Sequence, residues 1–250
     1  MISIVVPVYN SEKTIEKLCE KIIINMNSHN FDYEIILVDD NSRDKSYNLM
    51  KQLHNNYNNI TCIKLRENAG QQNALLCGLR YGLGNYFVTI DDDLQYNPDD
   101  IIELYIKMQE GYDVVYGVPS RKQHNKYRNS GTYIKEWMFS VMLGKPRAIR
   151  LTSYRIMTKN IVNQIKLETA SYVYLSATIL KYTKNIANVE INHYDRQFGK
   201  SNYNFKKLLK LFVNIIIYYS HSKLFNGYQK DVPQYIVEEV LISKTTHLEK

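Results

Sequence analysis

Short apolar runs alternate with amphipathic stretches along the first 117 residues of this 250-residue chain, and that alternation restricts the fold. The runs are rich in β-branched and aromatic residues, which is typical of buried strands. Buried strands that alternate with helices indicate βαβ units and a parallel sheet. We therefore expect an α/β fold, with a mostly parallel, Rossmann-like sheet flanked by helices. The expected strands are residues 2–8, 33–38, 60–65, 86–90 and 112–116.

Helical periodicity and end signals fill the spaces between these runs. Ser11 is placed to cap a helix that continues to about Met26. Pro98 suits the first turn of another helix, because proline is tolerated there. Beyond the fifth run, we expect a helix over 172–180 and a strand over 186–191. The remaining expected helices are residues 44–54, 70–83 and 133–143.

Polar clusters follow four of the expected strands at the points where they end. In open α/β sheets, ligands bind beyond the carboxyl ends of the strands. The sequence therefore predicts one functional site at this rim of the sheet. The clusters are Tyr9-Asn10, Asp39-Asp40, Asn68 and the triplet Asp91-Asp92-Asp93.

The triplet after residues 86–90 carries the strongest chemical signal. Three adjacent carboxylates repel one another unless a cation lies among them, and Mg²⁺ and Mn²⁺ prefer oxygen ligands. If the strand continues, Asp91 and Asp93 point to one side and Asp92 to the other. The pattern then predicts one metal ion shared by Asp91 and Asp93. A solvated acidic turn is the alternative.

Charge and cysteine content narrow the class of partner. A formal net charge of +7 and a pI of about 9.0 favour an anionic partner: a nucleotide, a lipid phosphate, a membrane surface or a nucleic acid. Cys19, Cys62 and Cys77 form no CxxC pair, so we expect reduced packing residues of a cytoplasmic protein. We expect no signal peptide and no spanning helix, because no apolar run reaches about 18 residues.

A dinucleotide-binding dehydrogenase is the obvious alternative for such a sheet. That class needs a glycine-rich turn after the first strand. Here Tyr9-Asn10-Ser11-Glu12 occupies that place, and Gly82 and Gly84 precede a strand instead of opening a helix. The sequence therefore disfavours a dehydrogenase.

Several motifs in fixed order resemble the family 2 glycosyltransferases, which have the GT-A fold. They are VPVYN at 6–10, VDDNS at 38–42 and the triplet. NAGQQNA at 68–74, DDDLQ at 91–95 and RQFGKS at 196–201 are similar to the polyprenyl-phosphate branch. That branch includes dolichyl-phosphate mannose synthases and bacterial undecaprenyl-phosphate sugar transferases. The resemblance covers roughly residues 1–210 and implies inverting transfer of a sugar from a nucleoside diphosphate to a polyprenyl phosphate.

The resemblance also implies roles for individual residues. Asp91, Asp93 and Gln95 would be ligands of Mg²⁺ or Mn²⁺, and Asp91, Asp93 and Arg196 the catalytic set. Asp40, with Asp39 beside it, would accept the N–H of the base, although a helix-capping turn is an alternative for this pair. UDP is favoured over GDP or dTDP. The other implied nucleotide contacts are Pro7, Tyr9, Ser11, Asn68, Gln71 and Asp92, and the implied phosphate contacts are Arg121, Arg128, Lys200 and Ser201.

The expected acceptor follows from a missing carboxylate. A hydroxyl acceptor needs a general base, whereas a phosphate is already an anion. The stretch 151–157 contains no acid where the related enzymes often carry one, which favours a lipid phosphate. Glu168 and Asp195 remain alternative bases for a transferase that extends a surface polysaccharide on a sugar hydroxyl. A basic nucleic-acid-binding protein is disfavoured, because an acidic site beside the cations would repel phosphate.

The chain divides by composition into residues 1–195, 196–225 and 226–250. The first part is the expected catalytic domain. The second begins with cations and becomes apolar, which suits an interfacial helix on an anionic membrane surface at the inner face. A core helix or a helix at a homo-oligomer interface is the alternative. The third is a polar tail with one strand-like run, 235–242.

Overall fold

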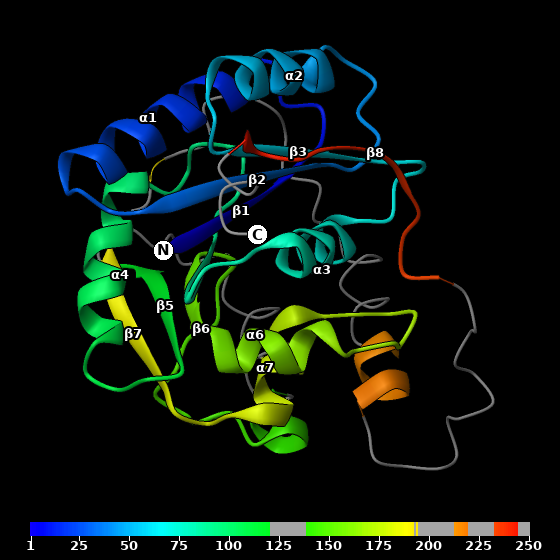
Figure 1. Ribbon diagram of the computed structural model, residues 1–250. Coiled ribbons are helices and arrows are strands. Elements are labelled where there is room, and N and C mark those ends of the chain that lie inside the picture. Colours follow the sequence, from blue (N-terminus) through cyan, green and yellow to red (C-terminus); the bar gives the residue numbers. More distant parts are fainter. Residues whose placement is uncertain (121–138, 193, 195–212, 220–232, 245–250) are drawn as a thin grey trace.

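A computed structural model of the chain describes residues 1–120, 139–192, 194, 213–219 and 233–244, and its strands form one eight-stranded sheet with helices on both faces (Figure 1). The strands lie in the order β7-β5-β6-β4-β1-β2-β3-β8. They are β1 (Ile2–Val8), β2 (Tyr33–Asp39), β3 (Ile60–Leu65), β4 (Tyr86–Thr89), β5 (Val114–Pro119), β6 (Arg155–Thr158), β7 (Ile186–Ile191) and β8 (Val237–Leu241). The helices are α1 (Ile15–Ser28), α2 (Ser46–Asn56), α3 (Gln71–Tyr81), η1 (Pro98–Asp100), α4 (Ile101–Met108), α6 (Lys159–Lys166) and α7 (Leu175–Tyr182).

Six of the eight strands run in one direction, which confirms the mostly parallel sheet expected from the sequence. Every antiparallel pair involves β6 or β8: β4 with β6, β5 with β6, and β3 with β8. The pairs β1–β2, β1–β4, β2–β3 and β5–β7 are parallel. The carboxyl ends of β1 to β5 and β7 therefore share one rim.

Two apolar layers hold the helices on the sheet, as alternating side chains of each strand require. In Figure 1, α1, α2 and α4 lie on one face, and α3, α6 and α7 lie on the other. Ile4 of β1 and Leu18 of α1 are fully buried in the first layer. Val5 of β1 and Leu79 of α3 are fully buried in the second. The sheet is thus covered on both faces, and only its rims remain for a site.

The antiparallel strand β6 was not expected. It inserts between β4 and β5, with Thr89 opposite Arg155 and Tyr116 opposite Arg155. Because β6 runs against its neighbours, its first residues lie at the rim where β4 and β5 end. The segment just before it, which contains Ser153, is therefore brought beside the acidic triplet.

The run expected as a strand near the end of the chain is confirmed as β8. It pairs with β3 through Ile63 opposite Val240 and Lys64 opposite Glu239. Part of the segment expected as a polar tail thus supplies an edge strand of the sheet. None of the described helices is long and apolar enough to cross a membrane.

Close contact between α3 and the sheet leads to a stability prediction at Gly78. A Cβ built there would lie 2.4 Å from Cγ1 of Val5 and 3.1 Å from Cγ2 of Val38. Alanine favours a helix by about 1 kcal/mol over glycine, but overpacking a core costs about 1–3 kcal/mol. We expect Gly78→Ala to lower the free energy of unfolding in urea by about 1–2 kcal/mol, with Lys17→Ala on an exposed face as a near-neutral control. Unchanged or higher stability of Gly78→Ala would show that the helix shifts freely on the sheet.

Candidate active site

The acidic triplet lies in a turn beyond β4. The strand ends at Thr89, and Asp92 and Asp93 are already in turn geometry. Leu94, which follows, has φ +60, a left-handed conformation that costs a non-glycine residue about 1–2 kcal/mol. The expected strand alternation therefore does not orient these carboxylates. The turn orients them, and the three carboxylates have different hydrogen-bond partners.

Asp91 is held from two directions. The Nε2 atom of Gln71, in the first turn of α3, donates to Asp91 Oδ1 over 2.6 Å. The hydroxyl of Ser153, just before β6, donates to Asp91 Oδ2 over 2.5 Å. Each carboxylate oxygen can accept more than one partner, so these contacts fix the group while leaving it able to bind a cation. Gln71 was predicted at this site; the sequence did not indicate Ser153.

Asp93 is hydrogen-bonded to Gln95, and Gln95 is hydrogen-bonded to Tyr194, which follows β7. Asp93 Oδ1 accepts the backbone N–H of Gln95 over 3.1 Å. The backbone N–H of Tyr194 donates to the carbonyl of Gln95 over 2.9 Å, and Gln95 Nε2 donates to the carbonyl of Tyr194 over 3.4 Å. Hydrogen bonds of this kind fix the orientation of side chains that bind a metal ion. With its nitrogen directed to Tyr194, the Gln95 side chain keeps its oxygen for another partner.

The donor set fits a hard divalent cation held jointly with a substrate. In the part of the chain that the structure describes, no three His, Cys, Asp or Glu side chains gather into a metal-binding group. Asp91, Asp93 and Gln95 offer two carboxylates and one amide oxygen. Mg²⁺ is commonly bound by one or two carboxylates, with waters and substrate phosphates completing its shell. These residues therefore suit a site completed by a phosphate-bearing ligand, not an all-protein cage.

Asp92 faces the loop that follows β1. Its Oδ2 atom accepts the backbone N–H of Tyr9 over 3.1 Å and a short hydrogen bond from the hydroxyl of Ser11. Burial raises the pKa of Asp92 to about 7, and the hydrogen bond from Ser11 opposes that rise. This carboxylate thus links two loops that are about 80 residues apart in sequence.

The loop after β1 is also fixed to the loop after β2. Asn10, at φ +55, receives the backbone N–H of Arg43 on its Oδ1 atom over 2.8 Å. The backbone N–H of Ser11 donates to Ser46 Oγ over 2.7 Å. Of the residues predicted to line a base pocket, Tyr9 is 41% exposed, whereas Pro7 is buried within β1 and Ser11 is nearly buried. The expected capping role of Ser11 is wrong, because α1 begins at Ile15 and the Ser11 hydroxyl is used on Asp92.

Asp39 and Asp40 are both buried where β2 ends. Asp40 accepts the backbone N–H groups of Ala69 and Gly70 at 2.7 and 3.0 Å, and burial raises its pKa to about 6. Asp39 accepts the N–H of Ser42 over 3.2 Å, and its pKa is also raised by burial. The side chain of Asn68 donates to the Asp40 carbonyl over 3.1 Å. Asp40 therefore orders the loop before α3 and Asp39 the loop after β2, and the contact of this pair with a base stays a prediction.

Arg155 is a buried cation that the sequence did not indicate. Its side chain is 1% exposed and donates to Thr89 Oγ1 over 3.2 Å and to Ser176 Oγ over 3.0 Å. Its guanidinium also lies over the ring of Tyr116 at 5.3 Å. Nε reaches the carbonyl of Ser153, whose hydroxyl holds Asp91. An arginine beside the apolar residues Ile156 and Met157 is the one sequence signal that points to it.

Comparison with known protein families fits this geometry. The model of the family described as glycosyl transferase family 2 matches residues 3–168, which is well over half of the chain. The chain belongs to glycosyl transferase family 2. The match ends at residue 168, so β7 and β8 of this family 2 transferase lie outside it.

Individual relatives agree with the family assignment. An undecaprenyl-phosphate 4-deoxy-4-formamido-L-arabinose transferase of Proteus mirabilis is 28% identical over 216 residues, a match that covers 86% of this chain and 66% of that protein. The chain thus spans just under two thirds of this curated relative.

Two solved structures share the fold, in agreement with the GT-A expectation. TarS of S. aureus (residues 1–349) has a TM-score of 0.58 at 19% identity, covering 89% of this chain and 67% of that one. Glucosyl-3-phosphoglycerate synthase of Mycobacterium tuberculosis, in complex with Mn²⁺, UDP and phosphoglyceric acid, has a TM-score of 0.63 at 16% identity. It covers 99% of this chain and 91% of that one.

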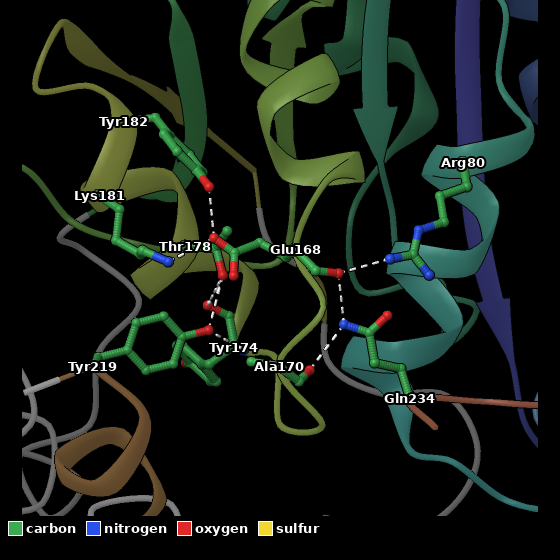
Figure 2. A network of polar contacts seen from close by, with 9 residues as sticks. All are labelled: Arg80, Glu168, Ala170, Tyr174, Thr178, Lys181, Tyr182, Tyr219 and Gln234. Carbon is green, nitrogen blue, oxygen red and sulfur yellow. Dashed lines mark hydrogen bonds and ion pairs between the residues drawn. The ribbon is translucent and has the colours of Figure 1, made fainter. Parts of the chain in front are cut away.

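Glu168, one of the two alternative bases, is engaged elsewhere in this family 2 transferase (Figure 2). Its carboxylate pairs with Lys181 Nζ over 2.6 Å and accepts the Tyr182 hydroxyl over 2.6 Å. Its carbonyl accepts from Arg80. Arg80 lies nine residues beyond Gln71 in α3, or about 13 Å along the helix from the contact with Asp91. The structure therefore does not bring Glu168 together with the triplet.

Five predicted site residues and the second alternative base lie outside the described residues. The five are Arg121, Arg128, Arg196, Lys200 and Ser201, and the base is Asp195. Tyr194, which directly precedes Asp195, donates its backbone N–H to the carbonyl of Gln95.

A half-buried carboxylate at the end of η1 leads to a pH prediction. Asp100 Oδ2 has no hydrogen-bond partner among the described residues, and burial, then Glu103 and Asp99, raise its pKa from 3.8 to about 6. The folded state therefore binds this proton more tightly than the unfolded chain, so the contribution of Asp100 to stability falls as pH rises from about 4 to 6.

Asp100→Asn should remove that loss. Between pH 4 and pH 8 the variant should gain on the order of 1 kcal/mol in unfolding free energy relative to the wild type, because solvent screens part of the effect at this half-buried side chain. Urea unfolding at both pH values measures this gain, with Glu20→Gln at an exposed position of α1 as the control that removes a carboxylate elsewhere. A gain that is equal at the two pH values would contradict the assignment to ionisation.

Proposed function

We propose that this family 2 protein is an inverting, metal-dependent glycosyltransferase that moves a sugar from a UDP-sugar to a polyprenyl phosphate. One observation carries the proposal. At a single rim, Asp91, Asp93 and Gln95 offer oxygen ligands, and the adjoining Asp92 binds the loop that carries Tyr9 and Ser11. The Proteus mirabilis relative is an undecaprenyl-phosphate sugar transferase, which supports the choice of acceptor.

The donor half of the reaction breaks the bond between the anomeric carbon and the diphosphate. When bound, Mg²⁺ or Mn²⁺ stabilises the negative charge that develops on the departing diphosphate. Asp91, Asp93 and Gln95 would hold the ion, and Gln71 and Ser153 keep Asp91 in place for it. Tyr9 and Ser11, with Asp39, Asp40 and Asn68, would receive the nucleoside. UDP is favoured because structural neighbours were solved with UDP or UDP-GlcNAc.

The acceptor half needs an oxygen nucleophile on the opposite side of the anomeric carbon. A phosphate oxygen of the lipid forms the new C–O bond as the C–O bond to the diphosphate breaks, so the configuration inverts. No proton has to be removed, because the phosphate is ionised at neutral pH. The engagement of Glu168 with Lys181 and Tyr182 supports a reaction without a carboxylate base. Arg196, with Arg121, Arg128, Lys200 and Ser201, would hold the phosphate groups.

A place at the inner face of the membrane follows from such an acceptor. The described helical residues 213–219 bury Ile215 and Tyr219 in the core, while Val213 is 46% and Ile216 is 37% exposed. Their packed face agrees with the core alternative, and their exposed apolar face agrees with an interfacial one. We propose peripheral attachment of a cytoplasmic protein, in which this face and the cations of 196–210 contact an anionic leaflet.

Thermal stability with and without metal tests the donor site. UDP should raise the unfolding temperature in Mg²⁺ or Mn²⁺ and not in EDTA, since the carboxylates of Asp91 and Asp93 repel a diphosphate unless a cation lies between them. At about 100 times Kd the stabilisation should be roughly 2.7 kcal/mol. Uridine is the control ligand that lacks phosphates, and GDP and dTDP test the base. An equal shift by UDP in EDTA would remove the metal from the account.

A further inference from the structure

A single oxygen atom joins the two loops that would bind the two ends of the donor. Asp92 Oδ2 accepts both the backbone N–H of Tyr9 and the hydroxyl of Ser11. Tyr9 and Ser11 follow β1, and Asp92 follows β4, the strand beside β1 in the sheet. The contact therefore spans the gap between the proposed nucleoside loop and the proposed metal loop.

Both loops are built to keep a defined shape. Asn10, between Tyr9 and Ser11, has φ +55, and Leu94, two residues after Asp92, has φ +60. Left-handed non-glycine residues persist only where surrounding contacts hold them, and they gather at functional sites. The loop after β1 is also hydrogen-bonded to Ser42 in the loop after β2 and to Ser46, the first residue of α2. Asp92 adds the connection toward the metal loop.

We propose that Asp92 is a positioning residue that fixes the nucleoside loop relative to Asp91 and Asp93, so that one nucleoside diphosphate engages both at once. The inference rests on the proposed function. A ligand that binds at two places gains from their fixed spacing, because the second contact becomes intramolecular. Loss of this connection should lower the affinity for the whole nucleoside diphosphate far more than the affinity for either the nucleoside or the metal ion alone.

The geometry separates a positioning role from a role of the negative charge. Since both hydrogen bonds end on one oxygen, the carbonyl oxygen of an amide can accept both. Asp92→Asn should therefore keep the connection while removing the charge, and Asp92→Ala should remove both. Ser11→Ala removes one of the two bonds and should fall between them.

Calorimetric binding to the intact protein provides the test, with uridine, Mn²⁺ alone, and UDP in Mn²⁺ as three separate ligands. We expect Asp92→Ala to lower the affinity for UDP in Mn²⁺ by about 10- to 100-fold and the affinity for uridine by less than about 3-fold. Asp92→Asn should stay within about 3-fold of the wild type for every ligand. Asp32→Ala, whose side chain is 78% exposed at the other end of the sheet, is the matched control and should change nothing.

Two results would overturn the inference: equal losses in Asp92→Asn and Asp92→Ala, or a loss for uridine as large as that for UDP. Hydrogen exchange of the ligand-free protein keeps it testable even if UDP does not bind. The Tyr9 amide should exchange faster in Asp92→Ala and at the wild-type rate in Asp92→Asn. A failure of the wild type to bind UDP would reject the proposed function alone, whereas unchanged Tyr9 exchange in Asp92→Ala would reject the positioning role.

Discussion

Asp91→Asn and Asp93→Asn are each expected to lower the rate of sugar transfer by at least about 10²- to 10³-fold. Each substitution exchanges a carboxylate for a weaker neutral ligand at the place where diphosphate charge must be stabilised. The folded structure should survive, because at position 91 the amide oxygen can still accept from Gln71 while the Ser153 hydroxyl turns to accept from the amide nitrogen. At position 93 the amide oxygen can still accept from the Gln95 N–H. The loss therefore belongs to the reaction, and equal unfolding temperatures of the variants would establish that.

Asp92→Asn is the control for this pair. It removes a charge from the same triplet but leaves the contacts to Tyr9 and Ser11, so its transfer rate should stay within about tenfold of the wild type. Kinetics of all three variants over a range of Mn²⁺ concentrations give the comparison. If Asp92→Asn were as damaging as the other two, the turn would not assign separate roles to these carboxylates.

The second large effect concerns the acceptor. Arg196→Ala should lower kcat/KM for a polyprenyl phosphate by about 10²-fold or more, because the phosphate loses its positioning and its charge partner. Glu168→Gln should keep at least about half of the activity, since that carboxylate lies on Lys181 and Tyr182. Lys181→Met removes the same ion pair from the other side, so it controls for any loss of stability in Glu168→Gln.

A different pattern would replace the lipid-phosphate acceptor with a sugar hydroxyl. If Glu168→Gln or Asp195→Asn stopped turnover while UDP binding in Mn²⁺ stayed normal, a general base would be required. A hydroxyl acceptor has that requirement and an ionised phosphate does not. Unchanged acceptor kinetics in Arg196→Ala would likewise remove the cation from the acceptor site.

The sequence predicted the parallel half of the fold well, because hydrophobic period and strand-end polarity are local signals. β1 to β4 and their helices lie where the apolar runs placed them, and the polar ends share a rim as the topology rule requires. The sequence did not predict β6, because this strand has only four residues and contains Arg155. The burial of Arg155 depends on Thr89 and Ser176, which belong to distant elements. No periodicity within a short window can indicate such a contact.

The candidate site was predicted in its residues and only partly in its geometry. The triplet stood out by composition, but its orientation comes from the turn at Leu94 and not from strand alternation. Ser11 looked like a helix cap because capping serines precede apolar periodicity, yet its hydroxyl serves Asp92 across the sheet. Ser153 became visible only once antiparallel β6 placed it beside Asp91.

Mass spectrometry of the lipid product tests the central claim most directly. The protein is incubated with Mn²⁺, a panel of UDP-sugars and a short-chain polyprenyl phosphate in detergent, and the lipid is analysed for the mass of one added sugar. We expect a glycosyl phosphate of inverted anomeric configuration with one UDP-sugar, no product in EDTA and none with Asp93→Asn. Release of UDP with transfer only to sugar hydroxyls, and none to the lipid phosphate, would contradict the account.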